Sequence, residues 1–374
     1  MTLSVYARPD GQIGIRNKVS IIFTVDCSRY VAQKLKTLFP EGTQLFGNPG
    51  GCGFMDGAFN KLIALGNHSS SAAALIVGLG CEGTDAYALA DAIATTGRPV
   101  EALKINEEGG DIKLIERGSR ILAQLLQYAS SVERAPLSPG DLVVGTECGG
   151  SDATSGLASN PITGVAGDRL IADGGTYMIS ELEELLGCGE ILAARAINAQ
   201  VAQEVKDAIA AAERRSFESG RFAWGYGNIM GGLTSIEEKS YGALAKSGTA
   251  PLQGILNRYG LPPRKGFWLQ TGEPGSGWFH GDPEGINQFA ACGAHIGLFT
   301  TGCGSTTGGL IPVIKIIANP NRMQLIHDNA DFDATPVIRG EATIQELGEK
   351  LYAEILAVAG GKLTKSEVYG HYEV

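Results

Sequence analysis

The stretch A-A-A-L-I-V-G-L-G-C-E-G, residues 72–83, decides the fold predicted for this chain. An apolar run that ends in glycines is typical of a buried parallel strand that delivers a loop to the carboxyl edge of a sheet. Residues 142–152, L-V-V-G-T-E-C-G-G-S-D, repeat this pattern, and residues 48–53, N-P-G-G-C-G, form a third glycine-rich turn. Loops at one sheet edge can meet in space, so the pattern indicates a shared site.

Working outward from this stretch, strand and helix signals alternate from Lys18 to Tyr128, which predicts a parallel sheet with right-handed crossovers. The segment Ser130–Gly140, with two prolines, is typical of a linker. We therefore predict the α/β class, with a Rossmann-like parallel-sheet domain over residues 1–132 and a second α/β domain over residues 140–374. The predicted strands are 19–25, 43–46, 72–78, 100–105, 141–145, 176–179, 296–300 and 313–317, and the predicted helices are 28–38, 56–65, 85–96, 111–128, 181–186, 191–216, 236–246 and 344–358.

Composition excludes several kinds of partner. The 30 basic and 40 acidic residues give a net charge of −10, which argues against nucleic acid and against an anionic membrane surface. The N-terminus has no apolar signal core, and no stretch of 18 uncharged apolar residues follows, so a cytoplasmic location is expected. Seven cysteines in a chain of 374 residues do not suggest a disulfide framework, so reduced thiols are expected.

Each glycine-rich turn holds one cysteine, and together Cys52, Cys81 and Cys148 with Glu82 and Glu147 suggest a metal-assisted enzyme more than a binding module. Three interpretations stay open. Small cysteines often pack in tight turns. The thiolates can instead bind iron, either as ligands of a single ion or as three ligands of a cluster with one open iron. A nucleophilic cysteine would need a nearby histidine, and none of the five histidines neighbours these turns.

The turn at Gly78–Gly83 also fits the dinucleotide fingerprint G-x-G-x-x-G, because it follows a strand, precedes a helix, and has Glu107 near the end of the next strand. A nicotinamide-dependent oxidoreductase is therefore one alternative. The unit is not the first of its domain, however, and Glu82 would put a negative charge near a pyrophosphate. A tight structural turn without a ligand is the other alternative.

Further along the chain, Glu147, Ser151 and Asp152 share one glycine-flanked loop, where acidic residues are candidates for metal ligation or acid–base work. Lys239 and Lys246 are seven residues apart on a predicted helix and so roughly share a face, which could hold an anionic substrate.

Two histidines differ in their expected roles. His280, beside Asp282, is a candidate ligand or base, whereas His295 lies in an apolar stretch and is expected to be structural. Thr300–Gly309 is a polar loop typical of an anion cradle, but it lacks the lysine of a P-loop.

Several long motifs together resemble the altronate/galactarate dehydratase family. The resemblance covers essentially the whole chain, and it implies an iron-dependent lyase that acts on a sugar acid or related hydroxy acid. The family includes the large subunit of sulfolactate sulfo-lyase, so release of sulfite is an alternative. The motifs are R-P-D-G-Q-I-G-I-R-N (8–17), V-G-L-G-C-E (77–82), G-T-E-C-G-G-S-D (145–152), G-G-L-T-S-I-E-E-K-S (231–240), F-T-T-G (299–302) and the ending G-H-Y-E-V.

The chain also departs from its resembling family. Dehydratases of this kind often carry a small SAF-type domain ahead of the large domain, so we expect a separate small SAF-type subunit as partner, and a homo-oligomer is possible. Cys303 stands where the family usually has the arginine of T-T-G-R-G, and W-G-Y-G-N-I-M precedes Gly231 where N-P-S-P-G-N is commoner. Both changes bear on the identity of the substrate.

β-Elimination beside a carboxylate needs a cation for the carboxylate, a base for the α-proton, and an acid for the leaving group. The substrate is therefore expected to be a small carboxylate, and the cofactor iron, as Fe²⁺ or an iron–sulfur cluster. The predicted site residues are the catalytic Glu147, Asp152 and Lys239, the substrate-binding Arg16, Asn17, Ser151, Asn228, Thr234, Lys246 and Thr301, and the metal-binding Cys52, Cys81 and Cys148.

Overall fold

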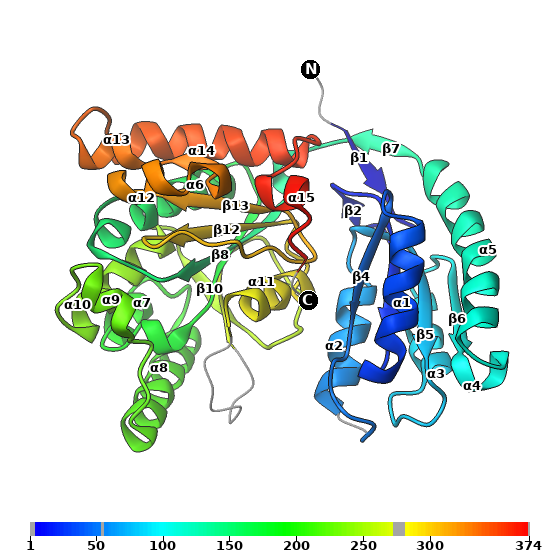
Figure 1. The fold of residues 1–374 in the computed structure, drawn as a ribbon. Coiled ribbons are helices and arrows are strands. Elements are labelled where there is room, and N and C mark those ends of the chain that lie inside the picture. Colours follow the sequence, from blue (N-terminus) through cyan, green and yellow to red (C-terminus); the bar gives the residue numbers. More distant parts are fainter. Residues whose placement is uncertain (1–3, 54–55, 272–280, 373–374) are drawn as a thin grey trace. The chain divides into compact units, whose positions relative to one another are not determined.

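A computed structural model describes residues 4–53, 56–271 and 281–372 (Figure 1). This part of the chain divides into two compact units, one up to Leu137 and the other from Ser138 onward, and each is described by itself. Both are built on parallel sheets, so the predicted α/β class is confirmed. The independence of the predicted domains 1–132 and 140–374 stays a prediction.

The first unit has a four-stranded parallel sheet in the order β4-β3-β5-β6. Ile21 and Leu75 pack with Leu35 and Leu122 of two helices on one face. Ile22 points to the other face, toward Gly66. The strands are β3 (Lys18–Phe23), β4 (Thr43–Gly47), β5 (Ser71–Gly78) and β6 (Val100–Lys104), and the helices are α1 (Asp26–Leu38), α2 (Asp56–Gly66), α3 (Ala86–Ala94), α4 (Ile105–Glu108) and α5 (Asp111–Ser130).

A short antiparallel sheet in this unit was not predicted. It has the order β2-β1-β7, formed by β1 (Ser4–Ala7), β2 (Ile13–Gly14) and β7 (Arg134–Pro136). The predicted linker thus contains a strand. The Arg134 guanidinium fixes it by donating to the Ser4 carbonyl (2.9 Å) and the Tyr6 hydroxyl (2.8 Å), a long-range contact that no local pattern signals.

The second unit has a seven-stranded parallel sheet in the order β10-β11-β9-β8-β12-β13-β14. The order of the strands reverses between β8 and β12. The strands are β8 (Val143–Gly149), β9 (Thr176–Ile179), β10 (Leu252–Leu256), β11 (Gly266–Gln270), β12 (Ile296–Thr301), β13 (Val313–Ile317) and β14 (Phe332–Asp333).

The helices of this unit correct three predictions. The helix predicted over 181–186 is wrong, because only Leu182–Glu184 forms a 3-10 turn. The helix predicted over 191–216 is two helices, since the Asn198 side chain accepts from Val201 N (2.9 Å) and starts the second one. The helix predicted over 236–246 ends at Leu244, and a 3-10 turn continues it. The elements are α7 (Gly189–Ala193), α8 (Ala199–Ser219), α9 (Tyr226–Met230), α10 (Ile236–Leu244) and the 3-10 turn η4 (Ala245–Ser247).

Helix α6 (Asn160–Ala172), which follows a π-helical turn at Ser155–Ser159, was not predicted. Its glycines obscure the helical pattern, yet the fold requires them. A Cβ on Gly164 would lie 2.5 Å from the Ala245 carbonyl oxygen, and one on Gly167 would lie 2.6 Å from the Tyr177 ring. The remaining helices are α11 (Asp282–Ala291), α12 (Pro320–Leu325), α13 (Thr335–Ile338), α14 (Ile344–Ala359) and α15 (Lys365–Tyr369).

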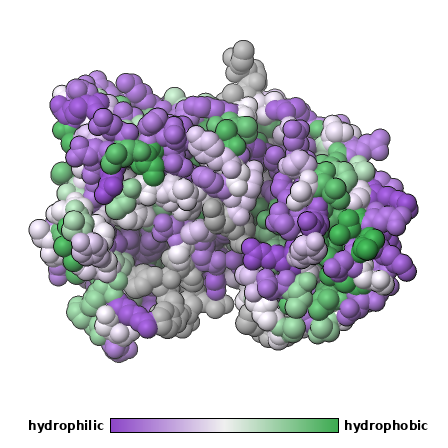
Figure 2. Space-filling model, viewed as in Figure 1, coloured by the Kyte–Doolittle hydropathy of each residue, from purple (hydrophilic) through white to green (hydrophobic). Residues whose placement is uncertain are grey.

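None of the helices in the described ranges has the length and apolar character that crossing a membrane requires. On the face shown in Figure 2, hydrophilic and hydrophobic residues are interspersed over each unit.

Candidate active site

The candidate site lies at the carboxyl edge of the second unit's sheet, where the strand order reverses between β8 and β12. Ligands of open parallel sheets bind in the crevice outside such a switch point. The loops after β8 and β12 touch each other there, because Gly302 N donates to the Gly150 carbonyl (3.2 Å). The E-C-G-G-S-D segment therefore lies at a sheet edge, as its sequence predicts.

Cys148, near the end of β8, is the centre of a cluster of acidic groups. Its Sγ lies 2.7 Å from Glu184 Oε2 and 3.5 Å from Glu181 Oε2, and both glutamates follow the neighbouring strand β9. Among the described residues, these three form a group of possible metal ligands whose ligand atoms lie within 4.8 Å of one another. Once the thiol is deprotonated, this sulfur and two carboxylates are a donor set that suits a divalent transition metal.

Two ammonium groups balance the charge of this cluster. Lys246 Nζ lies 3.0 Å from Cys148 Sγ and 3.3 Å from both Glu181 Oε2 and Glu184 Oε2. Lys239 Nζ lies 2.7 Å from the other oxygen of Glu184. Lys239 comes from α10 and Lys246 from η4, so the two lysines do not lie on one helix, but both ammonium groups reach the carboxylate of Glu184.

Glu181 reaches the cluster through a rare backbone conformation. Its φ of 63° and ψ of 59° make it the one non-glycine residue with positive φ in the described parts of the chain. Such a conformation costs about 1–3 kcal/mol and persists only where the surroundings impose it. It turns the Glu181 carboxylate back toward Cys148, whose backbone N donates to Oε2 (3.3 Å).

Burial sets the ionisation of three of the four acidic groups. It raises the pKa of the Cys148 thiol, with Glu181 and Glu184 adding to the effect. It raises the pKa of Glu181, again with help from Glu184. It also raises the pKa of Glu147, with help from Glu181, although Ser180 Oγ donates to Glu147 Oε2 (2.7 Å).

Glu184 behaves in the opposite way. Burial alone would raise its pKa, but Lys239 and Lys246 outweigh burial and lower the pKa to about 2. For Lys246, burial alone would lower the pKa, but the Cys148 sulfur and the carboxylates of Glu181 and Glu184 raise it well above its usual range. Glu184 is therefore a carboxylate and Lys246 an ammonium at neutral pH.

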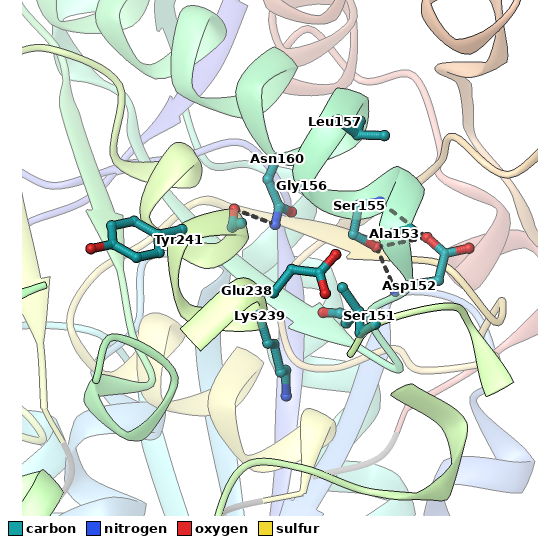
Figure 3. Close-up of a pocket in the computed structure, with 12 residues that line it drawn as sticks. Ser151, Asp152, Ala153, Ser155, Gly156, Leu157, Asn160, Glu238, Lys239 and Tyr241 are labelled. Carbon is teal, nitrogen blue, oxygen red and sulfur yellow. Dashed lines mark hydrogen bonds between the residues drawn. The ribbon is translucent and has the colours of Figure 1, made fainter. Parts of the chain in front are cut away.

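A cavity of about 260 Å³ adjoins this cluster (Figure 3). Lys239, which binds Glu184, is also part of its wall, and Figure 3 shows Tyr241 and Asp152 at opposite ends of the lining. Its size suits a small organic acid. The other lining residues are Ser151, Ala153, Ser155, Gly156, Leu157, Asn160, Leu233, Glu238 and Gly242.

Asp152, predicted as catalytic, is buried and held by both of its oxygens. Oδ1 accepts from Ser155 N (3.0 Å) and Thr154 Oγ1 (2.6 Å), and Oδ2 accepts from Asn319 Nδ2 (2.7 Å). A Cβ on Gly302 would lie 2.2 Å from Asp152 Cγ, so the loop after β12 packs directly on it. Its role as a base stays a prediction.

Ser151 and Asn228, predicted to bind substrate, meet at this edge. Ser151 Oγ donates to Cys148 Sγ (3.5 Å), and the Ser151 carbonyl accepts from Asn228 Nδ2 (2.9 Å). These contacts position the two residues beside the cluster, and their contact with substrate stays a prediction.

The two predicted threonines have local partners. Thr301 Oγ1, at the end of β12, accepts from Gly304 N (3.0 Å). Thr234 Oγ1 donates to Glu238 Oε2 (2.7 Å) at the start of α10 and is exposed.

Arg16 and Asn17, also predicted to bind substrate, belong to the first unit. Asn17 Oδ1 accepts from Arg8 Nη1 (2.8 Å), and its Nδ2 donates to the Ala129 carbonyl (2.7 Å), so Asn17 ties the start of β3 to α5. Arg16 is buried, and its carbonyl accepts from Arg8 Nη2 (2.9 Å). A role in substrate binding stays a prediction for both.

Cys52 and Cys81, predicted as metal ligands, likewise belong to the first unit and are exposed. Their two loops are neighbours, because Gly83 N donates to the Cys52 carbonyl (2.8 Å). That they share a metal with Cys148 stays a prediction.

The turn that resembles a dinucleotide fingerprint holds a carboxylate of its own. The backbone N–H groups of Leu79, Gly80 and Cys81 donate to Glu82 at 3.0, 2.7 and 3.0 Å, and Thr24 Oγ1 donates at 2.5 Å. A pyrophosphate would need these same backbone donors. Glu82 thus disfavours the nicotinamide alternative.

Of the two histidines, His280 lies outside the described residues. His295 is structural, as predicted, because its Nδ1 accepts from Val143 N (3.0 Å). Asp282, at the start of α11, is near the cluster: a Cβ on Gly149 would lie 2.5 Å from its Oδ2. Burial, and then Glu184, raise the pKa of Asp282.

Glu181 and Glu184 were not recognised from the sequence, where E-L-E-E-L suggested an ordinary helix. One signal was available. Both residues directly follow the predicted strand 176–179, so in a parallel sheet they lie at the same edge as Cys148.

A parallel α/β fold with a buried thiol–carboxylate cluster and a small pocket at a switch point defines an enzyme acting on a small molecule. Comparison with known proteins agrees. Residues 140–374 match the family described as D-galactarate/altronate dehydratase, C-terminal, and residues 5–130 match D-galactarate dehydratase/altronate hydrolase, second domain. The chain belongs to the D-galactarate/altronate dehydratase family, and it is an enzyme of the hydro-lyase type, as predicted.

Three relatives illustrate the breadth of the family. The chain is 33% identical to the (2R)-sulfolactate sulfo-lyase subunit beta of Chromohalobacter salexigens, over 98% of this chain and 95% of the relative. It is 30% identical to the altronate dehydratase of Escherichia coli, over 98% of this chain and 75% of that one. It is 31% identical to the galactarate dehydratase (L-threo-forming) of Escherichia coli, over 77% of this chain and 56% of that one.

Proposed function

We propose that this chain is the large, catalytic subunit of a two-component lyase that removes a leaving group β to the carboxylate of a small hydroxy acid with the help of a metal ion. The observation that carries the proposal is the buried cluster of Cys148, Glu181 and Glu184 beside a small pocket lined by Lys239. The names of the relatives supply the substrate classes: altronate and galactarate, or (2R)-sulfolactate.

The cluster suits a metal ion by a simple test: it already holds a cation. Its three acidic ligand groups surround the Lys246 ammonium at 3.0–3.3 Å, in a buried position where an unbalanced negative charge would be costly. Cys148, Glu181 and Glu184 would hold the metal, which we propose to be iron. When bound, iron would supply a Lewis acid that polarises an oxygen of the substrate.

The chain's own residues have distinct proposed roles. Lys239, in the wall of the pocket, would hold a substrate carboxylate. Glu147 or Asp152 would move the α-proton. Burial shifts the pKa of Glu147 upward, toward neutral pH, where a carboxyl group is most effective in proton transfer. Ser151 and Asn228 would orient the substrate at the loop after β8. A cytoplasmic location, where Cys148 stays reduced, is part of the proposal.

A separate small subunit of the SAF type completes the proposal. The relative from Chromohalobacter salexigens is named a subunit beta, and it has nearly the extent of this chain. About a quarter of the Escherichia coli altronate dehydratase lies outside the match. Water would screen the charges of an open site, so we expect the partner to raise the activity of this chain.

Sulfite release is the second candidate. The match to the sulfo-lyase subunit spans 95% of that relative, more than for either dehydratase. Cys303, which replaces the family's usual arginine, lies close to the substrate loop: a Cβ on Gly150 would be 3.2 Å from its Sγ.

The first test concerns the metal. Anaerobically purified protein should retain iron, and Cys148→Ser should lower the iron content, whereas Cys292→Ser, another buried cysteine of the same unit, should not. Iron analysis with sulfide analysis separates a single ion from a cluster. Equal iron in the wild type and in Cys148→Ser would remove this thiol from the metal site.

The second test concerns the reaction. The chain, loaded with Fe²⁺, is assayed with altronate, galactarate and (2R)-sulfolactate for release of a 2-oxo acid or sulfite, with and without a candidate small subunit. Lys239→Ala should cost about 2–5 kcal/mol of transition-state binding. A loss of catalytic efficiency smaller than tenfold, which corresponds to about 1.4 kcal/mol, would show that Lys239 has only a structural role. Lys206→Ala, whose ammonium pairs with Glu190 at the surface, is the matched control.

A further inference from the structure

The most unusual feature of the site is the position of the Lys246 ammonium. An ammonium has three N–H donors, and Lys246 Nζ has three acceptors: Cys148 Sγ at 3.0 Å, Glu181 Oε2 at 3.3 Å and Glu184 Oε2 at 3.3 Å. The sulfur and one carboxylate oxygen from each glutamate are also what this cluster offers to a metal ion. The lysine therefore stands where the metal would stand.

Two cations cannot share this position. A divalent metal binds a thiolate at about 2.3 Å and carboxylate oxygens at about 2.0–2.2 Å, which leaves no room for an ammonium among the same three atoms. The Lys246 side chain is 1% exposed, so its ammonium is shielded from solvent inside the cluster. The metal must displace it.

Lys239 provides the contrast that makes this specific. Its ammonium binds the opposite oxygen of Glu184, Oε1, at 2.7 Å and donates to the Ala223 carbonyl; it interacts with the Cys148 sulfur electrostatically, but no hydrogen bond between them is found in the described part of the chain. It stands beside the cluster, whereas Lys246 stands inside it.

We propose that Lys246 is a built-in competitor for the metal site: its ammonium fills the centre of the Cys148–Glu181–Glu184 cluster in the metal-free protein and is expelled when a divalent metal binds. The inference rests on the proposed metal site. Lys246 shares its partner Glu184 with Lys239 of the pocket wall, so expulsion frees an ammonium that an anionic substrate can take as a partner. Metal loading would then couple to substrate binding through one side chain.

The test uses Co²⁺ as the probe, because a direct cobalt–thiolate bond gives a charge-transfer absorption in the near ultraviolet. Metal-free wild type, Lys246→Met and Lys239→Met are titrated anaerobically with Co²⁺. We expect Lys246→Met to bind Co²⁺ at least tenfold more tightly than the wild type. We expect Lys239→Met, which also removes a nearby positive charge, to change the affinity less than about threefold.

The outcomes separate the inference from the proposed function. Equal affinities of wild type and Lys246→Met, or equal gains in both variants, overturn the competitor role while the metal site survives. Absence of the thiolate band in all three proteins overturns the metal site and the inference together.

A second measurement needs no variant and so does not depend on the folding of Lys246→Met. In a crystal structure of the wild type soaked with Co²⁺, anomalous scattering locates the metal. The inference expects cobalt at Cys148 Sγ with Lys246 Nζ outside hydrogen-bond distance of that sulfur. Cobalt bound to Sγ with Nζ still at its present 3.0 Å would overturn it.

Discussion

Replacing Glu184 with glutamine should markedly lower the free energy of unfolding of this protein. Glu184 is 6% exposed and receives an ammonium on each oxygen, Lys239 on Oε1 and Lys246 on Oε2. Glu184→Gln keeps the volume of the side chain but removes its charge. It leaves Lys246 with Glu181 and the Cys148 thiol as partners, and Lys239 with the Ala223 carbonyl.

The pKa of Glu184 gives the size of the effect. The fall in the pKa of Glu184 from 4.5 to about 2 corresponds to about 3 kcal/mol of stability at neutral pH, since each unit of pKa is worth about 1.4 kcal/mol. Removal of one partner from a buried ion pair typically costs 3–5 kcal/mol, which agrees. The pKa is lower in the folded state, so this contribution is full above about pH 4.5. It is lost as the pH falls toward 2.

Urea unfolding in the presence of EDTA measures this contribution without a metal. The chain has 3 tryptophans, none of them before residue 224, and Trp224 and Trp268 lie in the second unit, so tryptophan fluorescence follows the unit that contains Glu184. The matched control is Glu183→Gln on the same 3-10 turn, where the carboxylate is one third exposed and pairs with Arg215.

We expect Glu184→Gln to lose about 3 kcal/mol of unfolding free energy at pH 7 and Glu183→Gln less than about 1 kcal/mol. The difference in unfolding free energy between wild type and Glu184→Gln should become smaller as the pH falls from about 4.5 to 2. A loss below about 1 kcal/mol at pH 7, or a gap that does not depend on pH, would refute the assignment of Glu184 as the buried counter-ion.

Three other predictions concern Glu147, Glu82 and Gly302. Burial raises the pKa of Glu147, so its ionisation opposes folding once the pH exceeds the ordinary pKa of a glutamate. In urea unfolding, Glu147→Gln should therefore lose little free energy of unfolding at pH 5 and should gain stability relative to the wild type by pH 8. Because Glu82 occupies its own backbone donors, NADH fluorescence should not change on titration with the protein, and saturable binding would contradict this account of the turn. Gly302→Ala should lower the free energy of unfolding by about 1–3 kcal/mol or more, because its Cβ would lie 2.2 Å from an atom of Asp152. The control Gly225→Ala, whose Cβ would have its nearest atom at 4.0 Å, should have a small effect. Equal melting temperatures of the two variants would show that the loop at Gly302 accommodates the extra methyl group.

The sequence was a good guide to the sheets because buried parallel strands are near-continuous apolar runs. The strands at 176–179 and 313–317 have the predicted bounds. Helix α6 was missed because glycines demanded by close packing, such as Gly164 and Gly167, weaken the helical signal. Contacts of this kind come from distant parts of the chain, and a local pattern does not contain them.

The site was only partly predictable for a related reason. Cys148 and Glu147 follow a recognisable strand-and-glycine pattern, and Lys239 and Lys246 were recognised as candidate cations although the helix ends before Lys246. Glu181 was hidden because its left-handed backbone is imposed by its surroundings, and E-L-E-E-L carries no sign of it.

The cost of this cluster argues that it is functional. A buried network of charges is seldom more stable than well-packed apolar residues of similar volume, because each charge must leave water. Here two lysines and two glutamates surround a thiol, and Glu181 adds a strained backbone that costs about 1–3 kcal/mol more. A fold that needed only a core at this edge would be served better by leucines. Its position at the switch point between β8 and β12, beside a cavity of about 260 Å³, is where a parallel α/β enzyme binds its ligand. The charges are therefore best explained by chemistry performed on an anionic substrate, with stability given up to hold them in place.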